Sequence, residues 1–142
     1  MTHQEASAVV SLPVSEVDAK LREISSWPRF MVGLLDVIKI AHERYTFVVR
    51  DGHSVREVPV CAIPHPREHR VSWKALSGPA FDGEFRLHPE NDRQTRIAVS
   101  LVAEPAGFLA GLSDMLHPPV TSTAELVLQR LEAHLHAPAR AV

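Results

Sequence analysis

Hydrophobic and polar residues alternate along much of the chain between Leu34 and Ala103. The clearest example separates Phe81, Gly83, Phe85 and Leu87 from Asp82, Glu84, Arg86 and His88. A period of two is typical of a β-strand with one covered face and one face in water. Six segments have strand character: Leu35–Ile40, Tyr45–Arg50, Val55–Ile63, His69–Leu76, Ala80–His88 and Thr95–Ala103. Turn-forming residues separate these segments, which predicts an antiparallel meander.

Helical periodicity replaces this alternation near the C-terminus. Apolar residues recur three and four positions apart at Ala124, Leu128, Leu131 and Leu135, widened by Leu126 and Val127. The other side is polar and carries Gln129, Arg130, Glu132 and His134. Ser122 and Glu125 have capping-box spacing, so we expect a helix over Val120–Leu135. A shorter stripe of Phe108, Leu112 and Met115 is cut by Pro118-Pro119, which predicts two helical pieces that meet at a bend.

The first thirty or so residues predict one strand and two short helices before the meander. Ser7–Leu12 reads as a strand that stops at a proline. Ser15 and Asp18 have capping-box spacing, so a helix is expected over Ser15–Ser25. Pro28 is placed to open a second helical turn, because proline is favoured at the first helical position. A strand, two short helices, a meander and a long helix make an α+β layout of about seven strands.

Two residues in the predicted strands have special positions. Pro59 cannot donate a ladder hydrogen bond, so we expect a bulge or an edge position there. Gly83 stands in the middle of an otherwise regular strand, which indicates the close approach of another group.

Composition favours one ordinary globular domain over residues 1–142, because 45% of the residues are hydrophobic and only 23% are charged. A net charge of −2 gives no electrostatic footprint for nucleic acid. We expect neither a membrane span nor a signal peptide, since no apolar run is long enough and Met1–Ala8 is polar. The single Cys61, expected to be a buried inert thiol, excludes an internal disulfide and suits a cytoplasmic location.

The histidines and glycines give little sign of metal or cofactor chemistry. His65 and His69 flank Glu68, but nearby prolines disfavour a helix and no third ligand is evident, so we expect solvated loop histidines and no metal. His134 and His136 are expected to be surface groups. No phosphate-binding loop, dinucleotide fingerprint or nucleophile elbow occurs, and no cofactor is expected.

Four segments, in order, resemble one family. Trp27-Pro28-Arg29-Phe30-Met31 is similar to its WPxFM motif, and Val71-Ser72-Trp73-Lys74 is similar to its IxWx strand. The segments 83–89 and 95–107 are similar to its GxVxF strand and its TxV…PxG strand and helix entry. From about Ala6 to Leu135, the chain thus resembles the polyketide cyclase/dehydrase branch of the START-related, helix-grip superfamily (SRPBCC). The resemblance implies a curved sheet that grips the C-terminal helix, with a cavity for apolar molecules between them.

Bulky apolar residues from separate predicted elements are the candidate ligand-binding set. These are Trp27, Phe30, Met31, Trp73, Phe81, Phe85, Phe108, Leu112 and Met115. Each of them would also fit an ordinary core position, whereas the resemblance favours a pocket lining for the group. Tyr45, the only tyrosine, is a possible polar handle, although its facing is open.

The first functional hypothesis is a protein that binds a hydrophobic small molecule, polyketide-like or lipidic. The alternative is a cyclase, dehydratase or aromatase that uses the same cavity, and the catalytic residues stay unknown. A proton donor or acceptor would be needed, for which His88, Arg86, Arg50 and His117 are the candidates. The alternation described above points Arg86 and His88 outward. A third class, a partner-binding module, would instead expose a large apolar patch.

Overall fold

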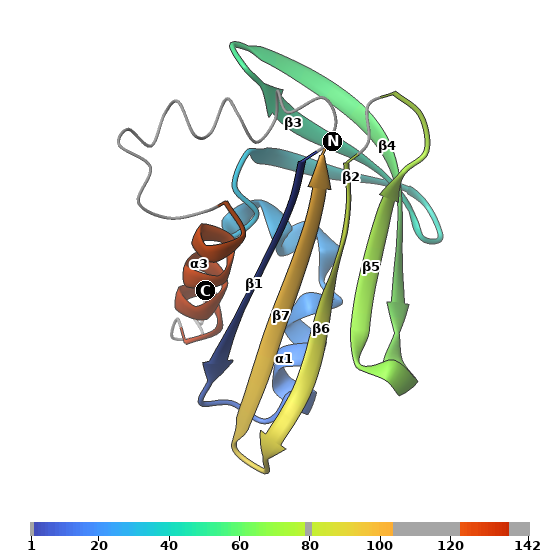
Figure 1. Ribbon diagram of the computed structural model, residues 1–142. Coiled ribbons are helices and arrows are strands. Elements are labelled where there is room, and N and C mark those ends of the chain that lie inside the picture. Colours follow the sequence, from blue (N-terminus) through green and yellow to red (C-terminus); the bar gives the residue numbers. More distant parts are fainter. Residues whose placement is uncertain (1, 79–80, 104–122, 137–142) are drawn as a thin grey trace, which may run out of the picture.

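In the part of the chain that the structure describes, one antiparallel sheet carries both α-helices on the same face (Figure 1). The computed structural model describes residues 2–78, 81–103 and 123–136. The sheet has seven strands in the order β1-β7-β6-β5-β4-β3-β2, and it curves so that β2, β3 and β4 swing away from the plane of β1, β7 and β6. The predicted α+β class and the meander are confirmed.

The elements follow the predicted order. The strands are β1 Thr2–Val10, β2 Leu34–Ala41, β3 Arg44–Asp51, β4 Ser54–His65, β5 Arg70–Ala75, β6 Phe81–Asn91 and β7 Gln94–Ala103. The helical elements are α1 Val14–Leu21, the 3₁₀ turns η1 Ile24–Arg29 and η2 Pro66–Glu68, and α3 Thr123–Leu135. The pieces predicted at Gly107–Leu116 and at the Pro118-Pro119 bend lie outside the described residues.

Boundaries near the N-terminus differ from the prediction. The first strand begins five residues earlier than Ser7, since β1 spans Thr2–Val10 and pairs with β7 along its length. The predicted Ser15–Asp18 capping box is wrong, because Pro13 is the N-cap and its side chain makes no capping hydrogen bond. Asp18 instead forms an ion pair of 2.7 Å with Arg22, one turn later. Pro28 lies inside η1 and does not open it.

The two faces of the sheet differ as the alternation predicts. On β6 the side chains of Phe81, Phe85 and Leu87 are buried, while Arg86 and His88 are exposed. The register aligns these rows across neighbouring strands, with Val71 opposite Phe85 and Trp73 opposite Gly83. We call the covered face, against which α1, η1 and α3 lie, the inward face (Figure 1).

Pro59 occupies an edge position, although β4 lies inside the sheet. β5 ends at Ala75, which pairs with Val60, so among the described strands residues 54–59 of β4 pair only with β3. The carbonyl of Pro59 accepts a hydrogen bond of 2.8 Å from the Leu76 N–H. Because the nitrogen and carbonyl of a strand residue point the same way, the missing N–H faces the side where β5 has ended. The expected edge position is confirmed, and the register with β3 continues without a bulge.

The apolar stripe of α3 packs mainly against β1. Ala124, Val127, Leu128, Leu131 and Leu135 are buried, and Leu126 is half-buried. The helix start is fixed from β1, because the Ala124 N–H donates to the Gln4 side-chain oxygen at 3.0 Å. Among the described residues, no helix is long and apolar enough to cross a membrane.

Replacing Leu131 with alanine tests whether α3 contributes to the core. Leu131 is fully buried, so L131A should lower the free energy of unfolding by about 2–5 kcal/mol in urea denaturation. Q129A, at an exposed position of the same helix, should change it by less than about 0.5 kcal/mol. Equal effects of the two substitutions would contradict the packing of α3.

Candidate functional site

The segment after α1 brings two aromatic side chains onto the inward face of the sheet. Trp27 and Phe30 belong to η1 and its end, and both are fully buried. The Trp27 indole N–H donates to the Leu21 carbonyl at 2.9 Å, which ties the ring to the last turn of α1. The Met31 N–H donates to the Trp27 carbonyl at 2.8 Å and closes the turn. These bonds hold the Trp27 ring in a fixed orientation over the sheet.

Trp27 stands at the centre of a group of rings from η1 and three strands, β3, β5 and β6, which we call the aromatic cluster. Its members are Trp27, Phe30, Phe47, Trp73, Phe81 and Phe85. Ring centroids lie 5.1 Å apart for Trp27 and Trp73, 5.5 Å for Trp27 and Phe85, and 5.6 Å for Trp73 and Phe85. Tilted and edge-to-face pairs in this distance range are favourable beyond the area that they bury.

Gly83 makes room for the Trp73 ring. A methyl group added to Gly83 would lie 2.5 and 2.6 Å from the Cζ2 and Cη2 atoms of Trp73, and it would also collide with the Ser100 carbonyl oxygen. The indole therefore lies directly over the glycine backbone of the neighbouring strand. The close approach predicted at Gly83 is confirmed.

Trp73 also carries a hydrogen-bond donor without an acceptor among the described residues. Its side chain is only 2% exposed, and within the described part of the chain nothing accepts from its Nε1 atom. The indole N–H of Trp27, in contrast, is satisfied by the Leu21 carbonyl. Buried polar groups are normally paired, so an orphan donor on the inward face is a feature that calls for an explanation.

Beyond the cluster, the inward face of β3 becomes more polar. Tyr45 is half-buried, with its ring centroid 6.4 Å from that of Phe47, two residues further along the same strand. The register places Lys39 and Val60 beside it. Burial and the nearby Glu43 carboxylate raise the pKa of the Tyr45 hydroxyl above its usual range. The phenol is therefore a protonated hydrogen-bond donor at neutral pH.

The structure brings most of the predicted ligand-binding residues together. Trp27, Phe30, Trp73, Phe81 and Phe85 belong to the cluster, and Met31 is buried beside them in the same core. Phe108, Leu112 and Met115 lie outside the described residues. That these residues bind a ligand stays a prediction. Phe47 was missed because the run Tyr45–Arg50 has no regular polar alternation that marks its inward side before the register is known.

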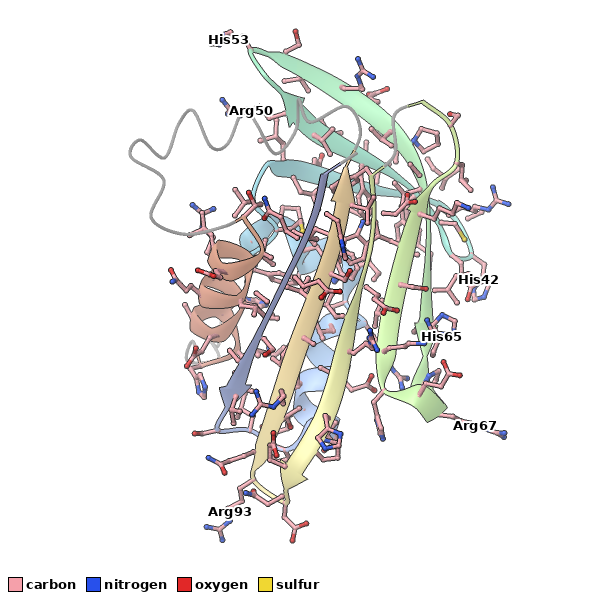
Figure 2. The ribbon with its side chains drawn as sticks, viewed as in Figure 1. His42, Arg50, His53, His65, Arg67 and Arg93 are labelled. Atoms are coloured by element: carbon pink, nitrogen blue, oxygen red, sulfur yellow. The ribbon has the colours of Figure 1, made fainter. Side chains whose placement is uncertain are left out.

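The candidate proton donors do not face the cluster. Arg86 and His88 are exposed on the outward face, as the alternation predicted, and His117 lies outside the described residues. Arg50 is exposed, and Figure 2 shows it at the periphery of the fold together with His42, His53 and Arg93. Among the described residues, no group of three side chains could hold a metal ion.

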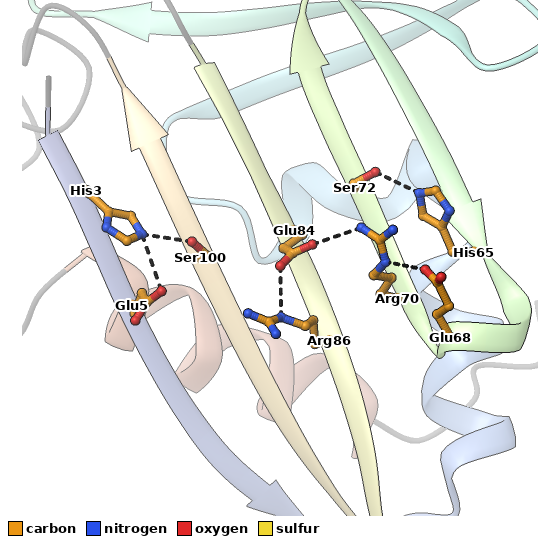
Figure 3. Close-up of polar contacts among 9 residues, drawn as sticks. All are labelled: His3, Glu5, His65, Glu68, Arg70, Ser72, Glu84, Arg86 and Ser100. Carbon is orange, nitrogen blue, oxygen red and sulfur yellow. Dashed lines mark hydrogen bonds and ion pairs between the residues drawn. The ribbon is translucent and has the colours of Figure 1, made fainter.

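A network of polar side chains covers the outward face (Figure 3). Glu84 accepts from Arg70 at 3.2 Å and from Arg86 at 2.8 Å, and Arg70 also donates to Glu68 at 2.6 Å. His65 contacts the Ser72 hydroxyl at 3.0 Å, so it is a half-buried strand residue and not the solvated loop histidine that we expected. Cys61 also differs from its expectation, because it is half-buried on this outward face between Arg44 and Lys74.

His134 is not a surface group, contrary to the prediction. It lies in the last turn of α3 and is half-buried, with its ring centroid 5.8 Å from that of Phe30 and a tilt of 31° between the planes. Burial, followed by the positive charges of Lys20 and Arg29, lowers the pKa of the imidazole below its usual value, and Glu23 opposes this.

Comparison with known proteins identifies the fold. No protein-family model and no curated protein matches the sequence. Several solved structures do match it. One is TTHA0849 from Thermus thermophilus, with 17% sequence identity and a TM-score of 0.72, and the match covers 94% of this chain and 97% of that protein's chain. The Zhui aromatase/cyclase from Streptomyces sp. R1128 matches at 14% identity and a TM-score of 0.67, with 96% of both chains covered. A START superfamily protein from Mycobacterium smegmatis matches at 10% identity and a TM-score of 0.71, with 94% and 96% covered.

These similarities extend over almost the whole chain. The protein therefore has the START-related, helix-grip fold that these structures share, as the resemblance implied. At identities of 17% or less, the similarity defines the fold.

A substitution at Gly83 tests the contact on which the cluster is built. G83A should lower the free energy of unfolding by about 1–3 kcal/mol, because the methyl group overlaps the Trp73 ring and the Ser100 carbonyl. The matched control is the G83A/W73L double variant, in which the smaller side chain relieves part of the overlap. The double variant should lose less free energy of unfolding than G83A and W73L lose together as single variants, by at least about 0.5 kcal/mol. Strict additivity would show that the two residues are not in contact.

Proposed function

We propose that the protein binds a hydrophobic small molecule on the inward face of its sheet, beside the aromatic cluster. The observation that supports this most directly is the buried N–H of Trp73, which has no acceptor among the described residues and lies in an otherwise apolar surrounding. An apolar ligand that also carries a hydrogen-bond acceptor would satisfy this donor, and its apolar surface would be removed from water. The proposed site extends from Trp73 to the half-buried Tyr45.

The site chemistry favours a flat, carbonyl-bearing ligand, polyketide-like or lipidic in kind. Aromatic rings give large contact areas, and burial of apolar surface contributes about 25 cal/mol per Å². A single well-placed hydrogen bond adds about 0.5–1.5 kcal/mol, which orients the ligand and does not dominate the affinity. The rings of the aromatic cluster contact one another at centroid distances of 5.1 to 6.3 Å. Entry of a ligand between them therefore requires some rings to move apart.

Two matched probes separate apolar burial from the hydrogen bond. Fluorene and 9-fluorenone are the same flat tricycle with a methylene or a carbonyl at one position. Both should bind, which would quench tryptophan fluorescence and raise the melting temperature. Fluorenone should bind about 2–10-fold more tightly if Trp73 Nε1 donates to its carbonyl.

Variants assign the probe to the site. W73F keeps an aromatic ring and removes the N–H, so it should abolish the preference for fluorenone while fluorene still binds. I38S replaces an apolar residue that is 43% exposed on the outward face and should leave both affinities unchanged. Failure of both probes to bind or to stabilise the protein would refute the proposed function.

An enzymatic role is the second candidate, and the inward position of Tyr45 favours it. A protonated phenol beside the site could serve as the general acid in a cyclisation or dehydration of a poly-β-keto chain. This reaction class is motivated by the structural similarity to an aromatase/cyclase. If the role is correct, a short poly-β-ketone incubated with the protein should yield a product distribution that differs from the one formed by spontaneous cyclisation. Y45F should remove that difference and retain fluorene binding, whereas unchanged products with the unsubstituted protein would exclude the role.

A further inference from the structure

We propose that protonation of His134 releases the C-terminal end of α3 from η1, which makes this contact sensitive to mild acid. The proposal concerns the packing of the fold and does not depend on ligand binding. It stands on three features of the contact: the position of the ring, the nitrogen that finds no partner in the described part of the chain, and the charges that surround it.

The ring of His134 lies in a space suited to the neutral imidazole. Its plane is tilted by 31° from that of Phe30 at a centroid distance of 5.8 Å, which is within the range of favourable contacts between aromatic rings. The Nε2 atom is buried and has no hydrogen-bond partner among the described residues. In the imidazolium both ring nitrogens carry an N–H, so Nε2 would be a donor to which none of those residues offers an acceptor, and the partial burial of the ring disfavours the charged form.

The charged groups that face His134 strengthen this effect. Lys20 from α1 and Arg29 from η1 are cations that disfavour a third positive charge, and Glu23, between α1 and η1, is the only anion among the described groups that shift the pKa of His134. On α3 itself, Arg130 lies one turn earlier on the same side of the helix. The C-terminus of a helix favours a cation, but burial is the largest influence on His134 and acts in the opposite direction.

The direction of the pH dependence follows from the lowered pKa. In the released or unfolded state the imidazole has its ordinary pKa of about 6.5. The closed contact holds the neutral form, so its stabilising effect is complete above about pH 6.5 and is lost as the pH falls towards the lower, folded-state pKa. Within that interval, the equilibrium constant for opening should rise up to about tenfold per pH unit.

Only the C-terminal end of α3 should open as the pH falls. The N-terminal end is held by the Gln4 side chain, which accepts from the Ala124 N–H at 3.0 Å. The C-terminal end carries His134 and contacts η1 through Phe30. Phe30 also contacts Phe85, with 5.9 Å between ring centroids, so release at His134 loosens one side of the aromatic cluster.

Hydrogen exchange between pH 7.5 and 5, corrected for the intrinsic pH dependence of exchange, measures this opening. Amides of residues 131–135 should show an opening constant that rises below about pH 6.5, while amides of Ile97–Leu101 in β7 should not follow it. H134F keeps a planar ring against Phe30 and removes the titrating group, so its opening constant should be flat over this range. H136N alters an exposed histidine two residues away and should behave like the unsubstituted protein.

An NMR titration of the unsubstituted protein provides a measurement that does not rely on the fold of any variant. The His134 ring should titrate below pH 6.5, and the indole N–H signal of Trp27 should shift with the same midpoint, because Phe30 connects the two rings. A midpoint of 6.5 or above would overturn the proposal. So would an H134F protein whose α3 amides open with falling pH as in the unsubstituted chain.

Discussion

The close packing of Trp27 against the sheet is the interaction on which the other features depend. Its ring lies within 5.1 to 6.3 Å of the centroids of Phe30, Phe47, Trp73 and Phe85, and its N–H is bonded to the end of α1. Because these partners come from the end of η1 and from three strands, one side chain fixes how the helical segment lies on the curved sheet. Gly83 extends the same arrangement, since only a residue without a side chain lets Trp73 reach Trp27 from its strand.

The sheet separates two kinds of chemistry. The outward face is a network of ion pairs whose members are partly exposed, and such pairs contribute little each to stability. The inward face and the helices packed on it are mainly apolar, and two polar atoms there, Nε1 of Trp73 on β5 and Nε2 of His134 on α3, are buried without a partner in the part of the chain that the structure describes. In an apolar surrounding an unpaired polar atom is expensive, so these two atoms are where a ligand or a proton has the largest effect. The binding proposal therefore concerns Trp73, and the proposal on pH dependence concerns His134.

Period-two alternation was enough to predict the strands, because one face of the sheet is covered and the other is in water. It failed for β1, whose first residues are polar: Gln4 faces inward to cap α3, which no local pattern reveals. The aromatic set was predictable because large apolar residues have few other places to go. Tyr45 could not be assigned a face without the β3 register, and Phe47 was missed for the same reason.

His134 shows a different limit of sequence analysis. On a helical wheel it lies at the flank of the apolar stripe, where a histidine normally meets solvent. It is half-buried in the structure, where its ring contacts Phe30, a residue more than a hundred positions earlier in the chain. A pattern read along one helix contains no information about such a partner.

The pairing of β1 with β7 has a consequence for biosynthesis. Thr2 lies opposite Ala103, so β1, which is made before the other described strands, has no β7 partner until roughly a hundred further residues have been made. At typical elongation rates of about 5–20 residues per second, this interval lasts for several seconds or more. Throughout it β1 is unpaired, because β7 is its only neighbour in the described sheet and has not yet been made. The polar residues His3, Gln4 and Glu5 suit a segment that must wait in water, because they make premature association of the nascent strand unfavourable.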